Sequence, residues 1–175
     1  MVNYAVLYGK TAFTLAKDIG VPQQAAQEFI DAYFAGFPGV RTFIDRTLEE
    51  TRTTGVVRTI SGRLRRMPEL TSRNGQIRAA AERETVNMPI QGTAADILKQ
   101  AMIDTAAALE KHNAAANTAS RMILTVHDEL LFEAPVDDVP AVSTLIRGTM
   151  ERAFPLAVPL TVDVGSGPNW NEAKS

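Results

Sequence analysis

The chain contains no cysteine, only two histidines and a single tryptophan in 175 residues. Without thiols it can form neither a disulfide nor a thiolate metal site, and two imidazoles are too few for a typical zinc centre. No apolar run approaches the length of a membrane span, and the first residues show no signal-peptide pattern. From these absences we expect a reduced, cytoplasmic protein.

The charges that are present are unevenly distributed, although the net charge is only −2. Residues 57–83 include seven arginines and two glutamates, whereas residues 124–163 include seven acids and two arginines. Clustered guanidinium groups suit phosphate, whose oxygens they can bind bidentately. Charge alone leaves a second interpretation open, in which the basic segment is an ordinary solvated surface.

Hydrophobic periodicity predicts helices with a small antiparallel sheet, an α+β fold of one domain or two small lobes. β-branched residues around Ser61 and Gly62 predict a hairpin. A long alanine-rich helix follows, in which we expect Pro89 to cause a kink and not a break. The predicted helices cover residues 3–9, 12–20, 22–35, a segment opening at 38, 74–112 and 137–153, and the last predicted strand covers 158–165.

Three polar residues of the long predicted helix, Arg83, Asn87 and Gln91, recur at intervals of four and so share one face. All three side chains can donate hydrogen bonds, and the DNA minor groove presents acceptors, purine N3 and pyrimidine O2, at every base pair. Such donors can bind a correctly paired duplex without reading its sequence. In the ordinary alternative, Asn87 satisfies backbone freed by Pro89 and Gln91 caps a restarted helix.

The segment 121–135 looks like a buried hairpin whose turn carries His127, Asp128 and Glu129. Adjacent residues of an extended strand point to opposite faces, so the two carboxylates cannot form a side-by-side acid/base pair. One carboxylate beside a turn suits a hard divalent cation such as Mg²⁺, and two-metal catalysis needs a second carboxylate from elsewhere. Equally, Asp128 is a good turn residue without further function.

Five segments, in order, resemble motifs of the C-terminal part of family A DNA polymerases, the family of bacterial DNA polymerase I. They are VNYAVLYGK (2–10), TISGRLRRMPEL (59–70), RAAAERETVNMPIQGTAADILK (78–99), VHDEL (126–130) and VDVGSGPNW (162–170). Together they extend over essentially the whole chain, whereas the HDE triplet alone would be a weak signal. The resemblance implies a fingers subdomain in residues 1–85 and the C-terminal part of a palm subdomain in residues 86–175.

The resemblance also implies roles at the hairpin turn. Asp128 matches a catalytic, metal-binding carboxylate, Glu129 its less critical catalytic neighbour, and His127 a residue that contacts the primer end. The implied metal is Mg²⁺ in the full-length enzyme. The implied activity is template-directed DNA synthesis, the transfer of a dNTP to a primer 3′ end, in DNA replication or repair.

Other matched positions imply contacts with substrates. Arg83, Asn87 and Gln91 fall on positions that touch the template–primer duplex, in agreement with the minor-groove argument. Tyr4 matches the position against which the incoming sugar packs, and Tyr8 matches the aromatic beside the templating base. The implied partners are primer–template DNA and dNTP, with no membrane, and we expect a monomer.

The chain departs from the family pattern at several points. Ala5 stands where the family usually has glycine, and Leu64 replaces one of the hairpin arginines. The fingers lysine and arginine that hold the triphosphate, and the motif with the first catalytic aspartate, would all lie before Met1. Removing one electrostatic group of this kind commonly costs about 10²–10³ in rate. We therefore expect the isolated 175-residue chain to be inactive as a polymerase.

Two other functions fit parts of the pattern. A non-catalytic duplex-binding module would keep the Arg83–Asn87–Gln91 stripe and would bind DNA in a salt-dependent way without needing metal. A metal phosphohydrolase built on His127 and Asp128 would need more histidines than the chain has. A helical scaffold without any site would require five motifs to coincide.

Overall fold

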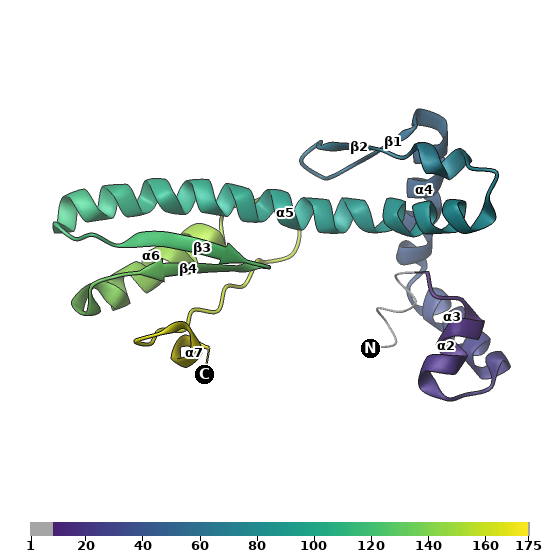
Figure 1. Ribbon diagram of the computed structural model, residues 1–175, viewed down its shortest axis with the longest axis horizontal. Coiled ribbons are helices and arrows are strands. Elements are labelled where there is room, and N and C mark those ends of the chain that lie inside the picture. Colours follow the sequence, from purple (N-terminus) through teal and green to yellow (C-terminus); the bar gives the residue numbers. More distant parts are fainter. Residues whose placement is uncertain (1–8, 175) are drawn as a thin grey trace. The chain divides into compact units, whose positions relative to one another are not determined.

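The computed structural model describes residues 9–174 and divides into two compact units, one ending at Thr93 and the other beginning at Ala94 (Figure 1). Helices predominate, and the strands form two separate two-stranded antiparallel sheets, one in each unit. The predicted α+β class is therefore confirmed. Within the described range, none of the helices has both the length and the hydropathy needed to span a membrane.

Three helices of the first unit begin and end close to the predicted signals. They are α2 (Ala12–Ile19), α3 (Gln23–Gly36) and α4 (Pro38–Thr54). Thr11 caps α2 by accepting the Thr14 amide at 3.3 Å, and Gly55 ends α4 with a φ of 74°. Leu15 of α2 and Ala26 of α3 belong to one buried cluster. Local signals in the sequence therefore determine where these helices start and stop.

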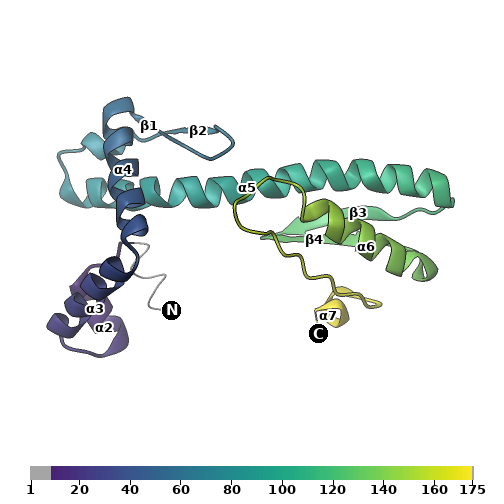
Figure 2. The same ribbon diagram turned by 180° about the vertical axis from the view of Figure 1, so that it is seen from behind.

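The predicted hairpin of the first unit is present and lies beside the long helix that follows it (Figures 1 and 2). It consists of β1 (Val56–Arg58) and β2 (Leu64–Arg66), followed by the 3-10 helix η1 (Pro68–Thr71). The Ile60 amide in the hairpin loop donates to Thr93 Oγ1 at 3.1 Å. A Cβ atom at Gly92 would come within 2.6 Å of Thr59 Cγ2. Glycine at this position is what allows the loop to approach the helix so closely.

The longest element is α5 (Gly75–Ala116), which continues through Pro89 without a break, as predicted. Proline lacks the amide that would bond the carbonyl four residues earlier, so one backbone bond of the helix is missing. The Thr93 hydroxyl donates to the Pro89 carbonyl on the next turn. Ala81 and Met88 of α5 belong to the core of the first unit, and Leu109 belongs to the core of the second.

The second unit combines the end of α5 with a hairpin and further helices. The hairpin strands and the two helices that follow them in sequence are β3 (Arg121–Val126), β4 (Glu129–Glu133), the 3-10 helix η2 (Val136–Asp138) and α6 (Val139–Met150). Leu109, Val142 and Ile146 form the buried core, against which Phe132 of β4 packs. The prediction of a buried hairpin is wrong, since Leu124 of β3 is 42% exposed. A two-stranded sheet that packs on helices with one face leaves the other face in solvent.

Two predictions for the last 40 residues are also wrong. Residues 158–165 form no strand. Side chains bond the backbone there instead, because the Val162 amide donates to Glu151 Oε1 and its carbonyl accepts from Arg147 Nε, both at 3.3 Å. Helix α6 does not start with Asp137 as its cap, because residues 136–138 form a 3-10 turn and Pro140 lies in the first turn of α6. The chain ends with the short helix α7 (Trp170–Ala173).

Candidate functional site

The predicted stripe of Arg83, Asn87 and Gln91 lies on α5, with its members one helical turn apart on the same face. Arg83 and Gln91 are exposed, and Asn87 is half-buried. Within residues 9–174 none of the three side chains makes a hydrogen bond or an ion pair. Asn87 therefore does not bond the backbone that Pro89 frees, and all three donors are available to a ligand.

The acidic residues that flank Arg83 on α5 are both paired with other arginines. Glu82 Oε1 lies 2.6 Å from a terminal nitrogen of Arg52 on α4, and Glu84 Oε2 lies 2.5 Å from one of Arg65 on β2. These ion pairs are solvent-exposed, so each adds little to stability. Their effect on the site is electrostatic, because they neutralise the two carboxylates next to Arg83 in sequence, and Arg83 itself has no ion pair within residues 9–174.

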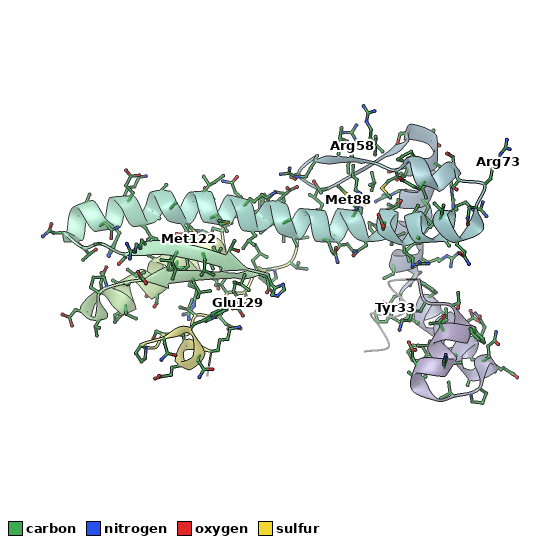
Figure 3. All side chains as sticks on the ribbon, viewed as in Figure 1. Tyr33, Arg58, Arg73, Met88, Met122 and Glu129 are labelled. Carbon is green, nitrogen blue, oxygen red and sulfur yellow. The ribbon has the colours of Figure 1, made fainter. Side chains whose placement is uncertain are left out.

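Other arginines of the basic segment also face solvent. Figure 3 shows Arg58 on β1 and Arg73 before α5 extending away from the backbone, and both are exposed. Leu64, which stands where the resembling family has an arginine, is 52% exposed and brings no charge to the hairpin surface. The first unit therefore presents guanidinium groups on its hairpin and on α5, the kind of group that is able to bind phosphate oxygens.

The turn between β3 and β4 consists of His127 and Asp128, because Val126 pairs directly with Glu129. His127 has a φ of 53°, a left-handed conformation that is costly for a residue with a Cβ atom. A positive φ at the first loop residue matches the strand twist in a two-residue hairpin, which explains why the turn adopts it. The two predicted catalytic residues, Asp128 and Glu129, and the predicted primer contact, His127, are all exposed.

The two adjacent carboxylates of this turn have different surroundings. Glu129 Oε1 lies 3.0 Å from Lys174 Nζ, and the Glu129 carbonyl accepts the Thr125 hydroxyl at 3.1 Å. The side chain of Asp128 has no hydrogen bond or ion pair with any residue in the range 9–174. Within residues 9–174, Glu129 therefore forms an ion pair and Asp128 does not. Sequence spacing gave no indication of Lys174, which lies far along the chain from the turn.

A free and exposed carboxylate fits Mg²⁺, which is often bound through one or two protein carboxylates and retains several waters. The described part of the chain contains no group of three or more acidic or histidine side chains able to hold a metal ion. Asp128 can therefore supply one ligand of a magnesium site but not the complete set.

The two predicted nucleotide-binding residues, Tyr4 and Tyr8, and the helix predicted over residues 3–9 lie outside the described residues. The next residue, Gly9, passes close to the stripe: a Cβ atom there would lie 3.5 Å from Cγ of Arg83. Gly9 also has a φ of 71°, which favours glycine. The backbone that follows Tyr8 is therefore adjacent to the first donor of the stripe.

A buried polar network in the second unit was not predicted from the sequence. His112 Nε2 lies 2.8 Å from Asp138 Oδ1, and Ser120 Oγ donates to Asp138 Oδ2 at 2.8 Å. Burial acts to raise the pKa of Asp138, but hydrogen bonds from His112, Ser120 and Thr118 outweigh it and lower the pKa. The network is no nucleophilic triad, because the buried serine hydroxyl bonds the aspartate and not the histidine. It links His112 of α5 and Ser120, the residue before β3, to Asp138 of η2.

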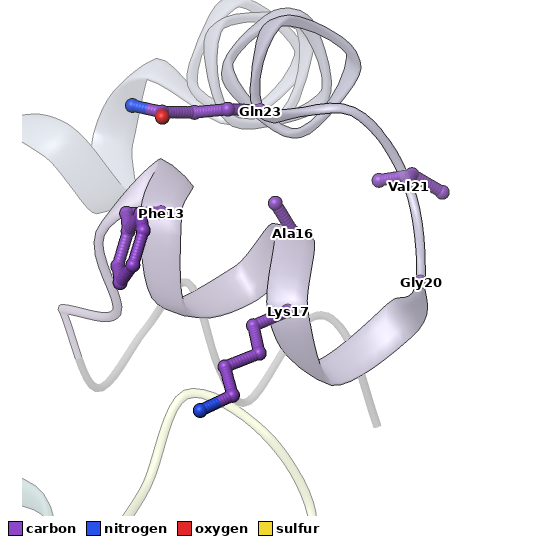
Figure 4. A pocket seen from close by; sticks show the side chains of 6 residues that line it. All are labelled: Phe13, Ala16, Lys17, Gly20, Val21 and Gln23. Carbon is purple, nitrogen blue, oxygen red and sulfur yellow. The ribbon is translucent and has the colours of Figure 1, made fainter.

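The first unit also contains a pocket of about 490 Å³ where α2 meets the start of α3 (Figure 4). It is lined by Phe13, Ala16, Lys17, Gly20, Val21 and Gln23. The only charged side chain among these is Lys17, and none of the predicted site residues lines the pocket. The candidate functional groups on α5 and on the β3–β4 turn lie outside this pocket.

Comparison with known proteins gives a consistent result. Residues 1–172 match the family model of DNA polymerase family A. The chain is 49% identical over 173 residues to DNA polymerase I of Deinococcus radiodurans and 47% identical to the thermostable DNA polymerase I of Thermus aquaticus. Both alignments cover 99% of this chain. A solved structure described as the POL domain of Pol1 from M. smegmatis, in complex with DNA primer-template and dNTP, superposes with a TM-score of 0.90 at 40% identity.

The matched relatives are much longer than this chain. The chain spans 18% of the Deinococcus protein and 20% of the Thermus aquaticus protein. The structural match covers 99% of this chain and 30% of the solved one.

The conformation of His127 predicts an unequal effect of two substitutions. His127→Val should lower the free energy of unfolding by about 1–2 kcal/mol, because a β-branched residue resists a positive φ. His127→Asn should stay within about 0.5 kcal/mol of the original, because asparagine tolerates this conformation. Urea unfolding followed by fluorescence of Trp170, the only tryptophan, measures both. Equal stability of the two variants would contradict the assigned turn geometry.

Proposed function

The chain belongs to DNA polymerase family A, and from this premise we propose that it supplies fingers and palm elements for template-directed DNA synthesis. In that reaction the primer 3′ hydroxyl attacks the α-phosphate of a dNTP and pyrophosphate leaves. The solved M. smegmatis neighbour is described as bound to DNA primer-template and dNTP, which supports the same partners for this chain. We extend the proposal to a monomer that works in DNA replication or repair.

We assign residues 1–85 to the fingers subdomain and residues 86–175 to the C-terminal part of the palm. The order of the five sequence motifs supports this division, since the hairpin and helices precede α5 and the carboxylate turn follows it. The two compact units meet at residues 93–94, inside α5. The helix is thus shared between the two assigned subdomains, and it carries the donor stripe close to that boundary.

The observation that carries the proposal is the free carboxylate of Asp128 at an exposed hairpin turn. We assign Asp128 as a ligand of Mg²⁺, which when bound would stabilise the negative charge that develops during nucleotidyl transfer. Glu129, whose charge is balanced by Lys174, takes the less critical place. His127, on the same turn, is assigned to contact the primer end.

The stripe of Arg83, Asn87 and Gln91 is assigned to the minor groove of the primer–template duplex. Its three donors have no partner within residues 9–174, and the acids beside Arg83 are neutralised. Purine N3 and pyrimidine O2 accept hydrogen bonds at every base pair, so the contact is independent of sequence. This property suits an enzyme that must copy any template. Tyr4 and Tyr8 are assigned to the incoming nucleotide on the family pattern alone.

A second candidate function is a non-catalytic duplex-binding module. It is favoured by the contrast, within residues 9–174, between three unpaired donors on one face of α5 and one unpaired carboxylate at the β3–β4 turn. Two-metal catalysis needs a second carboxylate, so we propose that the 175-residue chain on its own binds duplex DNA but does not extend a primer. Salt-dependent binding that is unaffected by removing Mg²⁺ is what this module would show.

Substitution of Asp128 tests the proposed activity. In the full-length protein, Asp128→Asn should reduce primer extension by about 10²–10³-fold, because one charged ligand of the metal is lost. Affinity for primer–template DNA measured without metal should stay unchanged. Asp137→Asn, a change of another exposed acid in the same unit, is the matched control and should extend primers normally. Normal extension by Asp128→Asn would refute the assignment.

Substitution of the stripe tests the proposed duplex contact. Arg83→Ala should weaken binding of the 175-residue chain to duplex DNA about tenfold, the value of a hydrogen bond from a charged donor. The loss should be the same for duplexes of different sequence, as fluorescence anisotropy would measure. Arg41→Ala is the control, because Arg41 is paired with Asp45 on α4. A loss confined to one DNA sequence, or an equal loss in both variants, would argue against minor-groove binding.

A further inference from the structure

The last residues of the chain contact the β3–β4 turn. Lys174 Nζ lies 3.0 Å from Glu129 Oε1 and 4.9 Å from the centre of the Trp170 ring. The lysine therefore combines an ion pair with a cation–π contact, and the aromatic ring limits where its ammonium group can go. Two segments 45 residues apart in sequence meet at the residue next to Asp128.

The segment before Lys174 folds back on itself, so that the backbone at Gly165 and Gly167 lies against α7. A Cβ atom at Gly165 would lie 1.9 Å from the Ala173 carbonyl oxygen, and one at Gly167 would lie 2.9 Å from the Ala173 nitrogen. The chain at 165–167 thus passes directly against α7, at a distance that only glycine permits. Asn169 caps α7 by accepting the Glu172 amide at 3.2 Å and donating to Glu172 Oε1 at 2.6 Å.

We propose that Lys174 is a positioning residue for the carboxylate turn: it holds Glu129 and so fixes the place of the neighbouring Asp128. Glu129 is restrained twice, through its side chain by Lys174 and through its carbonyl by the Thr125 hydroxyl. Asp128 itself has no restraint from any side chain in the range 9–174. The position of its carboxylate therefore depends on the backbone of the turn, which Glu129 anchors.

The ion pair also separates the roles of the two adjacent acids. Without Lys174, two negative side chains would stand next to each other on an exposed turn and either could attract a divalent cation. With Lys174 in place, the charge of Glu129 is balanced and Asp128 keeps its own. This inference rests on the proposed function of Asp128, but the contact between Lys174 and Glu129 can be tested without any polymerase activity.

Amide exchange of residues 126–131, measured by NMR on the 175-residue chain, tests the restraint directly. Lys174→Ala should speed this exchange by about two- to fivefold, the range expected of an exposed ion pair. Lys174→Arg and the charge swap Glu129→Lys with Lys174→Glu should restore the original rates, because each keeps an ion pair. Unchanged exchange in Lys174→Ala would overturn the proposal.

Further variants distinguish a specific restraint of the turn by Lys174 from a general increase in amide exchange. Gly165→Ala keeps the lysine but displaces Ala173, so it should also speed exchange at the turn, whereas Gly39→Ala, where a methyl meets nothing within 4 Å, should not. Lys111→Ala removes an exposed lysine of α5 and should leave the turn unchanged. If Lys111→Ala speeds exchange as much as Lys174→Ala, the effect is not specific and the proposal is wrong.

In the full-length protein, Lys174→Ala should lower kcat about two- to fivefold while KM for primer–template DNA stays the same, since the turn is misplaced but the stripe is intact. A change confined to KM would count against positioning. The assignment of Asp128 as a metal ligand and the restraint by Lys174 can each be contradicted without the other. If Asp128→Asn extends primers normally while Lys174→Ala speeds amide exchange, the restraint stands and the catalytic assignment falls.

Discussion

Both compact units build their cores in part on α5, which runs from Gly75 to Ala116. It supplies Ala81 and Met88 to one core and Leu109 to the other. A proline in the middle removes a backbone hydrogen bond, yet the helix continues. One turn after Pro89, the Thr93 hydroxyl donates to the Pro89 carbonyl and accepts a hydrogen bond from the Ile60 amide in the hairpin loop. The stripe of donors lies on this same stretch.

Some charged side chains of the candidate site form ion pairs with one another, and others have no charged partner within residues 9–174. Arginines from α4 and β2 are paired with Glu82 and Glu84, whereas Arg83 has no ion pair within residues 9–174. Lys174 is paired with Glu129, whereas Asp128 has no ion pair in the same range. None of these pairs contributes much to stability, because all are exposed. Their importance lies in deciding which groups can meet phosphate, DNA bases or a cation.

Local signals in the sequence predicted most helices, both hairpins and the stripe, because caps, glycines and a period of four act over a few residues. They failed where a distant partner decides the outcome. Residues 158–165 have the composition of a strand, but side chains at Arg147 and Glu151 bond their backbone instead. The exposure of Leu124, the His112–Asp138 contact and the pairing of Glu129 with Lys174 all depend on how elements pack, which spacing does not encode.

We propose that the carboxylate of Asp128 and the donors of Arg83, Asn87 and Gln91 act on the same DNA end. A structure of the full-length protein with primer–template DNA, a dNTP and Mg²⁺ is the test. We expect Asp128 to be a ligand of the metal beside the primer 3′ end, with the stripe in the adjacent minor groove. A complex in which Asp128 faces solvent away from the primer, or in which the stripe contacts no base pair, would contradict it.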